Sequence, residues 1–366
     1  MTKRAPYCLT SAHGLVTIEL LVLFAVLEAG AEEVDDLLWV SLRDRGEHVL
    51  GMVVNTPPRY ERGTLLLGFE EPELYQHPPQ ARHLAATLQE LASGNAQVIV
   101  ATHSPFFASG RLFESVRMFR KDASNASETS CTQISIERVA AALAEALGEK
   151  PTEPSALLAS IEQILQPSQR ELLFCGFPVL VEGEEDIALI ASHLRLSERW
   201  DEFRRLGGHF VLAQGKTNLS RLLAICNELA IPAYAVFDGD GPHETDAEKA
   251  QEKTKRNKRD NRCLLSLADC PNADPLADST VRGERITMWP KTLVAAVKAD
   301  VGADLWDNTA SKVRDELGLN GVSEKNGLLL AAIFEALWSS GARTAALAQL
   351  CEDILCRGAR VPAIPT

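Results

Sequence analysis

The stretch Phe177-Pro-Val-Leu-Val-Glu182-Gly-Glu-Glu-Asp186 is followed by two further short apolar runs, Phe210-Val-Leu-Ala213 and Ile231-Pro-Ala-Tyr-Ala-Val-Phe237-Asp238-Gly-Asp240. Segments of helical period separate these runs, which is the pattern of a β-α-β-α-β unit with parallel strands. Right-handed crossovers place the carboxyl ends of parallel strands along one edge of the sheet, where ligands bind. We therefore expect Glu182, Asp238 and Asp240 to converge at that edge.

These carboxylates predict a metal site. Asp186 lies one helical turn after Glu182, so we expect it on the same side. Carboxylates gathered closely repel each other unless a cation neutralises them, and hard oxygen ligands suit Mg²⁺ or Mn²⁺. The predicted ligands are Glu182, Asp186, Asp238 and Asp240. An alternative stays open, because acidic residues in the first turn of a helix gain about 0.3–1 kcal/mol from its dipole, and Asp-Gly-Asp also suits an ordinary turn.

The composition is that of a soluble globular protein with more than one domain. The chain has 366 residues, 46% of them hydrophobic and 24% charged, which favours two or three domains. The longest apolar run, Leu15–Leu27, contains Glu19 and is too short to span a bilayer, and we expect no secretory signal. Eight cysteines without paired spacing indicate neither a zinc site nor a disulfide framework, which favours a reducing cytoplasm.

A basic run stands out against the formal net charge of −13. It covers residues 249–262 and begins shortly after the predicted carboxylate edge. Basic residues here would contact DNA phosphates without reading sequence, while a solvated lysine-rich loop is the alternative. Lys216, which heads the helix after the second apolar run, has the same two interpretations. The predicted DNA contacts are Lys216, Lys253, Lys255, Arg256, Lys258 and Arg259.

The rest of the chain shows both helical and strand patterns. Two apolar runs in the first third of the chain end in polar residues, which again suggests parallel strands with a site. The predicted strands are residues 64–69, 97–101 and 115–119. The predicted helices are residues 9–30, 79–93, 135–148 and 154–166, and residues 286–357 are predicted to form a helical tail.

Two of these segments resemble a known ATPase family. Leu65–Pro78 and Val98–Pro105 resemble the Walker B, D-loop and H-loop segments of ABC-type ATPases, in the branch found in OLD-family (overcoming lysogenization defect) nucleases. The resemblance implies that Glu70 lies near Mg²⁺, that Glu71 polarises water and that His103 senses the γ-phosphate. No Gly-x-x-x-x-Gly-Lys-Ser/Thr loop precedes them. We therefore expect little ATP hydrolysis by this chain alone, and ATP as a ligand only if that loop is supplied elsewhere.

Two further segments, Val181–Asp186 and Phe237–Asp240, resemble the hallmarks of a Toprim domain, the catalytic fold shared by topoisomerases, primases and OLD nucleases. The resemblance implies that the four predicted carboxylates hold two divalent ions and hydrolyse a phosphodiester. It also implies a late lysine that stabilises the transition state, for which Lys325 is the candidate. The family supplies a further acid, for which Glu284 and Asp300 are the local candidates.

The sequence as a whole predicts an α/β fold in four parts. These are a partial ABC-type ATPase segment (1–133), a helical linker (134–168), a Toprim catalytic domain (169–270) and a mostly helical part that completes the Toprim region (271–366). The predicted function is a Mg²⁺- or Mn²⁺-dependent DNA endonuclease of the cytoplasm, without membrane association. A homodimer is expected, with a partner protein in a defence system. The alternatives are an ATP-gated DNA-binding scaffold of ABC or SMC type with an inert Toprim domain, and a Toprim primase or topoisomerase.

Overall fold

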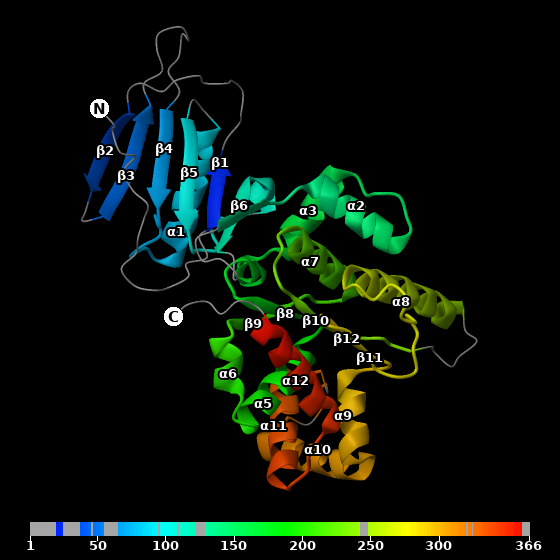
Figure 1. The fold of residues 1–366 in the computed structure, drawn as a ribbon. Coiled ribbons are helices and arrows are strands. Elements are labelled where there is room, and N and C mark those ends of the chain that lie inside the picture. The colour runs from blue at the N-terminus through cyan, green and yellow to red at the C-terminus, as the bar shows by residue number, and fades with distance from the viewer. Residues whose placement is uncertain are drawn as a thin grey trace.

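The computed structural model describes residues 20–24, 37–44, 47–54, 65–93, 96–108, 110–121, 129–241, 248–319, 321–323 and 325–360. Two five-stranded sheets organise these residues. Figure 1 shows the N-terminal sheet at the top and the C-terminal sheet below it, with helices on both faces of the second sheet. The mixed α/β fold with a parallel sheet that the sequence predicts is confirmed.

The N-terminal sheet has the strand order β4-β5-β1-β6-β7. The parallel neighbours β4 (Leu65–Glu70) and β5 (Ala96–Thr102) are connected by α1 (Pro78–Ala92). The other strands are β1 (Leu20–Phe24), β6 (Val116–Lys121) and β7 (Thr129–Gln133), with the 3₁₀ helix η1 (Gly110–Ser115) before β6. A separate antiparallel hairpin is formed by β2 (Leu37–Asp44) and β3 (Glu47–Val54).

The predicted helix at residues 9–30 is wrong where the structure describes it. Residues 20–24 form β1, which pairs antiparallel with both β5 and β6. A short apolar run fits a buried strand and a buried helix equally well, and only pairing with distant segments decides between them. The other residues of that predicted helix lie outside the described part of the chain, and the β2–β3 hairpin was not predicted.

The C-terminal sheet has the strand order β11-β12-β10-β8-β9. Its parallel strands are β8 (Phe177–Val181), β9 (Gly208–Leu212), β10 (Tyr234–Asp238) and β12 (Ile286–Trp289), with β11 (Val281–Arg282) antiparallel at the edge. The first strand in the chain, β8, thus lies between the other two strands of the predicted unit. Residues 286–289 were predicted as helix, but they form a buried strand because β10 offers a free edge for pairing.

Helices cover both faces of this sheet. One face carries α7 (Lys216–Glu228) and α8 (Glu248–Leu267), against which α2 (Ile136–Leu147) packs. The other face carries α5 (Glu184–Leu196), α9 (Leu293–Val301), α10 (Ala303–Leu317), α11 (Gly327–Ser339) and α12 (Ala345–Arg360). Alternation along β8 explains the two cores, since Phe177, Val179 and Val181 face one layer and Leu180 faces the other.

The predicted helical linker is part of the packed structure. It holds α2, α3 (Pro154–Ile164) and the first residues of the short helix α4 (Pro167–Arg170). The 3₁₀ helix η2 (Glu171–Leu173) follows α4. On α2, Arg138 pairs with Glu228 at the end of α7. Just after α2, Glu149 accepts two hydrogen bonds from Arg259 on α8, at 2.5 and 2.8 Å. These contacts tie the linker to the second sheet, while the four domain limits themselves stay a prediction.

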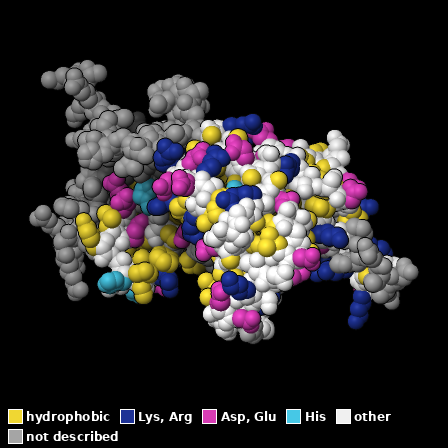
Figure 2. Space-filling view, turned by 90° about the horizontal axis from the view of Figure 1, so that it is seen from below, with side chains coloured by type: hydrophobic (Ala, Val, Ile, Leu, Met, Phe, Trp, Pro, Cys, Tyr) yellow, Lys and Arg dark blue, Asp and Glu magenta, His cyan; other side chains and the backbone are white. Residues whose placement is uncertain are grey.

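Basic side chains and the C-terminal helix mark two further features of the surface. Figure 2 shows Lys and Arg side chains gathered at the right-hand end of the molecule, where Figure 1 places the beginning of α8.

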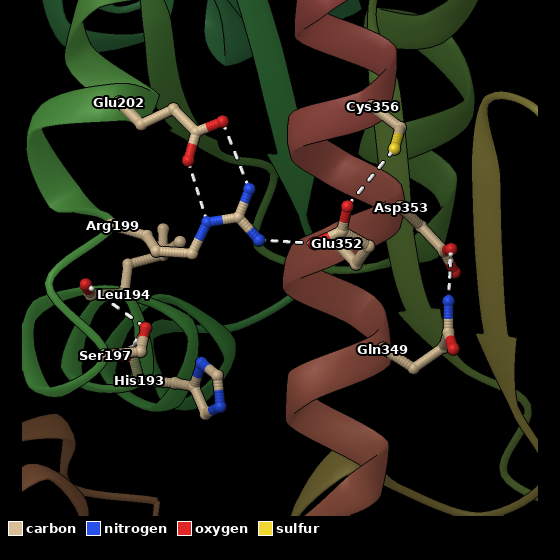
Figure 3. Close-up of polar contacts among 9 residues, drawn as sticks. All are labelled: His193, Leu194, Ser197, Arg199, Glu202, Gln349, Glu352, Asp353 and Cys356. Atoms are coloured by element: carbon tan, nitrogen blue, oxygen red, sulfur yellow. Dashed lines mark hydrogen bonds and ion pairs between the residues drawn. The ribbon is translucent and has the colours of Figure 1, made fainter.

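Figure 3 shows Arg199, just before α6 (Trp200–Arg205), reaching both Glu202 on α6 and Glu352 on α12. This bridge fastens α12 to the sheet's helical layer. Among the described helices, none has the length and apolar character needed to cross a bilayer.

A carboxylate and lysine cavity at the edge of the parallel sheet

A cavity of about 610 Å³ lies at the carboxyl edge of the C-terminal sheet. Its walls come from the ends of β8 and β10, the first turn of α5, and the loops that precede α9 and α11. The charged side chains that line it are Glu182, Glu185, Asp186, Asp238, Asp240, Lys253 and Lys325. All four predicted metal ligands and the candidate catalytic lysine therefore share one cavity, although they span more than a third of the chain.

The strand register brings Glu182 to the end of β10. Val181 on β8 lies opposite Val236 on β10, so the residues that follow on each strand emerge side by side. The backbone N–H of Asp238 donates a hydrogen bond to Glu182 Oε2 at 3.3 Å. Asp238 Oδ1 in turn accepts a hydrogen bond from the N–H of Leu293 at 2.9 Å. Backbone donors thus hold both carboxylates at the rim.

Both interpretations of the acidic first turn of α5 have support in the structure. Asp186 is only 2% exposed, and its Oδ2 accepts a hydrogen bond from the N–H of Gly183 at 3.0 Å, as an N-terminal residue of a helix does. It also lines the cavity, together with Glu185, which sequence reasoning left as an ordinary helix-start residue. Glu184 is exposed and lies outside the cavity lining.

The carboxylates hold more negative charge than their surroundings stabilise. Burial, and then the neighbouring charge of Glu182, raises the pKa of Asp238 to about 7. Burial also raises the pKa of Glu182, against the opposing effect of Lys216, and raises that of Asp186 well above its usual range, with Asp238 as the next cause. A group of buried acids that resist ionisation in the protein alone is what a cation would stabilise in the charged form.

The donor set fits a divalent metal by its chemistry. Carboxylate oxygens are the ligands that Mg²⁺ and Mn²⁺ prefer, and the cavity offers them from two strands and a helix. In the described part of the chain, however, no three His, Cys, Asp or Glu side chains meet closely enough to form a ready-made metal site. The carboxylates that would bind a metal therefore line one cavity, but Asp186 and Asp238 each direct one oxygen to a backbone N–H group.

Lys216 supplies a positive charge within the protein itself. Its side chain is 5% exposed, and Nζ lies 2.8 Å from Asp240 Oδ2. Asp240 has a φ of 51°, an uncommon backbone conformation for a residue with a side chain. The sequence left open whether Lys216 is an exposed helix-start lysine or a group beside the site, and its burial against Asp240 rules out the exposed position.

We expect Lys216→Met to lower the free energy of unfolding by about 1–2 kcal/mol, less than for a fully buried pair because Asp240 is partly exposed. The loss arises because Asp240 would then face the other carboxylates without its cation. Urea unfolding at pH 7 measures it, and millimolar Mg²⁺ should reduce the difference from wild type. Lys255→Met, on the exposed face of α8, serves as the control and should change stability little. A deficit in Lys216→Met that Mg²⁺ leaves unchanged would contradict this account.

The basic run forms one helix whose faces differ. Lys253 and Arg256 line the cavities beside the carboxylates, with Asn257 and Asp260 on the same helical face. Lys216, on α7, lines one of these cavities as well. The other predicted DNA contacts on α8 lie outside these linings: Lys255 and Lys258 are exposed, and Arg259 pairs with Glu149 and Asp260. The run is a helix and not a loop, while its contact with DNA stays a prediction.

Sequence reasoning missed two asparagines that hold the Asp-Gly-Asp turn. Asn261 is fully buried, and its Nδ2 donates to the carbonyl oxygens of Gly239 and Pro275, each at 2.8 Å. One turn earlier on α8, Asn257 Nδ2 donates to the carbonyl oxygen of Asp240 at 3.3 Å. Spacing of four residues was the signal, because it places both amides on one face of the helix.

The candidates for a further acid do not reach the cavity. Glu284 pairs with Arg357 and Arg360 of α12, and Asp300 accepts hydrogen bonds from Thr344 and the N–H of Ala346. On the β12 side, the cavity is lined by Thr292 and Val294 instead. Lys325, by contrast, lines the cavity from the loop before α11, while its role as the late lysine stays a prediction.

The ATPase-like residues also come together, at the ends of β4 and β5. Glu70 ends β4, and the next residue, Glu71, has its Oε1 3.3 Å from His103 Nε2. Glu73, which the sequence analysis assigned no role, accepts hydrogen bonds through Oε1 from Thr102 Oγ1 at 2.5 Å and from the N–H of His103 at 3.1 Å. Glu73 thus fastens the loop after β4 to the end of β5.

Comparisons with known proteins match the same two regions. Residues 58–108 match the sequence model of the AAA ATPase domain, and residues 173–240 match that of the "Overcoming lysogenization defect protein-like, TOPRIM domain". A curated relative, the OLD nuclease of Thermus scotoductus, is 25% identical over 216 residues. That match covers 58% of this chain and 38% of the relative, so the chain spans well under half the length of that protein.

Solved structures with the same kind of description were also found. The C-terminal region of the Burkholderia pseudomallei OLD protein is 16% identical with a TM-score of 0.33, covering 50% of this chain and 99% of that one. The C-terminal region of the Xanthomonas campestris pv. campestris OLD protein is 14% identical with a TM-score of 0.32, covering 51% and 97%. The resemblance to the OLD family is confirmed by the matched segments. Along the chain, an AAA ATPase segment is followed by an OLD-like TOPRIM domain.

Proposed function

We propose that this chain is a metal-dependent DNA endonuclease that hydrolyses phosphodiester bonds at the carboxylate cavity. The observation that carries the proposal is the meeting of Glu182, Asp186, Asp238 and Asp240 at one sheet edge, in a cavity that two lysines also line. The similarity to an OLD nuclease supports the same reaction class. The predicted alternatives, a DNA-binding scaffold and a primase or topoisomerase, have no comparable observation in their favour.

The acidic and the basic side chains of the cavity would have different roles. The four carboxylates would hold one or two Mg²⁺ or Mn²⁺ ions, which when bound would polarise the phosphodiester and activate water. Lys325 and Lys253 face the same cavity and would neutralise the phosphate as negative charge builds up on it. Lys216 would hold the Asp240 carboxylate in place. The asparagines of α8 would hold the Asp-Gly-Asp turn rigid, so that its two carboxylates stay at a set distance.

Supercoiled plasmid incubated with the purified chain tests the proposal. With Mg²⁺ or Mn²⁺ we expect nicked or linear product. With EDTA or without added metal we expect none, because the carboxylates cannot activate water without a metal ion. Agarose gels measure the product, with Ca²⁺ as a parallel condition. Product that persists in EDTA would contradict the metal dependence. Closed relaxed circles in place of nicked DNA would point to the topoisomerase alternative.

A further inference from the structure

Three cavities lie in a row along the beginning of α7. The carboxylate cavity shares Glu182, Gly215, Asp240 and Lys253 with a second cavity of about 420 Å³. The second cavity shares Gln214 and Asn218 with a third, of about 280 Å³. Because neighbouring cavities share these residues, the three lie next to one another. We call this row of cavities, which leaves the carboxylates and runs past the end of β9 toward α3 and α4, the groove.

The middle cavity has the chemistry of a phosphate site. Lys216, Lys253 and Arg256 supply positive charge, and Asn257 adds an amide. Of the three acids in the same lining, Asp240 and Asp260 are paired with basic side chains, and Glu182 is one of the proposed metal ligands. Asp240 pairs with Lys216 at 2.8 Å. Asp260 pairs with Arg259 at 3.2 Å and lies 3.8 Å from Arg256. Lysine and arginine that face a groove beside a hydrolytic centre suit the backbone phosphate next to the one that is cut.

The third cavity has a different chemistry, because its lining includes no carboxylate and no lysine. Amide side chains dominate it, contributed by α3, by the loop after it and by the start of α7. They are Gln163, Gln166, Gln169, Gln214 and Asn218, and they are joined by the planar guanidinium of Arg221. The amide nitrogens of Gln166 and Gln169 donate to backbone carbonyl oxygens, so Gln163 and Gln214 are the amides that we expect to meet a ligand. An amide presents a donor and an acceptor side by side, which matches the edges of nucleobases, and the guanidinium plane of Arg221 offers a surface for stacking.

A concave pocket of this kind accepts only a group that protrudes from its ligand. Bases in a duplex are stacked inside the double helix, and they are read by elements that enter a groove of the DNA. Unpaired bases can be splayed out and inserted into a protein pocket. The order of the three cavities, carboxylate, cationic and amide, also follows the order of groups along one strand from the cut phosphate to a neighbouring nucleotide.

We propose that this groove binds a single strand of nucleic acid, with a backbone phosphate in the middle cavity and an unpaired base in the amide cavity. The inference deepens the proposed function, on which it rests, by naming the substrate class as DNA with an unpaired stretch beside the cleavage point. Duplex DNA lying across the surface without entering the amide cavity is the competing arrangement.

Fluorescence anisotropy in Ca²⁺ tests this with three labelled probes: a blunt duplex of about 20 base pairs, the same duplex with a single-stranded overhang, and that overhang made of abasic nucleotides. A base held in the amide cavity adds to the affinity, so we expect the overhang to tighten binding by about tenfold and the abasic overhang to lose most of that gain. The double variant Gln163→Ala with Gln214→Asn should lose it as well. Asparagine is chosen because Gln214 has a φ of 58° and asparagine tolerates that conformation.

Gln349→Ala is the matched control. Gln349 is an exposed glutamine of α12 whose side chain donates a hydrogen bond to Asp353 (Figure 3), and it is not among the residues that line the three cavities. Equal affinity for the blunt and overhang probes would overturn the inference, and so would an abasic overhang that binds as well as the natural one. The two proposals fail separately. A protein that prefers the overhang but never nicks plasmid would contradict the proposed nuclease activity. A nuclease without preference for the overhang would contradict only the proposed binding of a single strand in the groove.

Discussion

Asp238→Asn should abolish metal-dependent nicking while making the metal-free protein more stable. Asparagine keeps the shape of aspartate and can still accept the hydrogen bond from the N–H of Leu293. It removes one anionic metal ligand, and a metal's contribution of several kcal/mol to the transition state corresponds to a rate loss of at least about a hundredfold. Plasmid nicking in Mg²⁺ measures the loss. Asp315→Asn, at an exposed position of α10, should retain wild-type activity.

The stability gain follows from the pKa of Asp238, which burial and the charge of Glu182 raise to about 7. The unfolded chain releases this proton near pH 4 and the folded protein only near pH 7. Between these values the folded state binds the additional proton, so the free energy of unfolding of the wild type falls as pH rises and levels off above pH 7.

Asp238→Asn lacks that slope, and at pH 8 in EDTA it should be more stable by on the order of 4 kcal/mol, the equivalent of a pKa that is raised from 3.8 to about 7. Denaturant unfolding at several pH values measures the difference, and saturating Mg²⁺ should reduce it because the metal then stabilises the charged carboxylates of the wild type. A variant that is less stable than wild type at pH 8 in EDTA would refute the charge argument, even if nicking were lost.

Gly239→Ala should be the most damaging single-methyl change at the cavity. A Cβ on Gly239 would lie 2.4 Å from the carbonyl oxygen of Trp289 and 3.2 Å from that of Pro290, both backbone atoms that cannot swing aside. The N–H of Gly239 donates to the same Trp289 oxygen at 2.6 Å, and this hydrogen bond holds the turn against the end of β12. Forcing a methyl group into such a contact costs about 1–3 kcal/mol.

The displaced turn carries Asp238 and Asp240, so nicking in Mg²⁺ should fall by about a hundredfold along with the stability. Gly241→Ala is the matched control. Its Cβ would lie 3.1 Å from the Pro290 carbonyl oxygen, a contact that a shift of a few tenths of an ångström relieves, and we expect a much smaller effect on both measurements. Equal losses in the two variants would show that the contact with Trp289 is not what sets the turn.

The carboxylate edge is the part of this protein that its sequence predicts best. Glu182 and Asp238 lie at or directly after the ends of apolar runs, and parallel strands joined by right-handed crossovers bring such ends together in any sheet of this type. Local pattern and handedness were therefore sufficient, and the hydrogen bond from the N–H of Asp238 to Glu182 reflects that rule. Lys325 could be placed only through the family resemblance, since an exposed lysine before a helix has no distinctive local pattern.

Other features depend on contacts between segments that no local pattern specifies. Residues 20–24 form a strand because they pair with β5 on one side and with β6 on the other. Only the packing of α8 separates Lys253 and Arg256, which face the groove, from Lys255 and Lys258, which do not. The apolar runs and their spacing determined the sheet and the edge where the acids meet. Tertiary structure decided which cations and amides surround them, because that depends on which faces of distant helices come into contact.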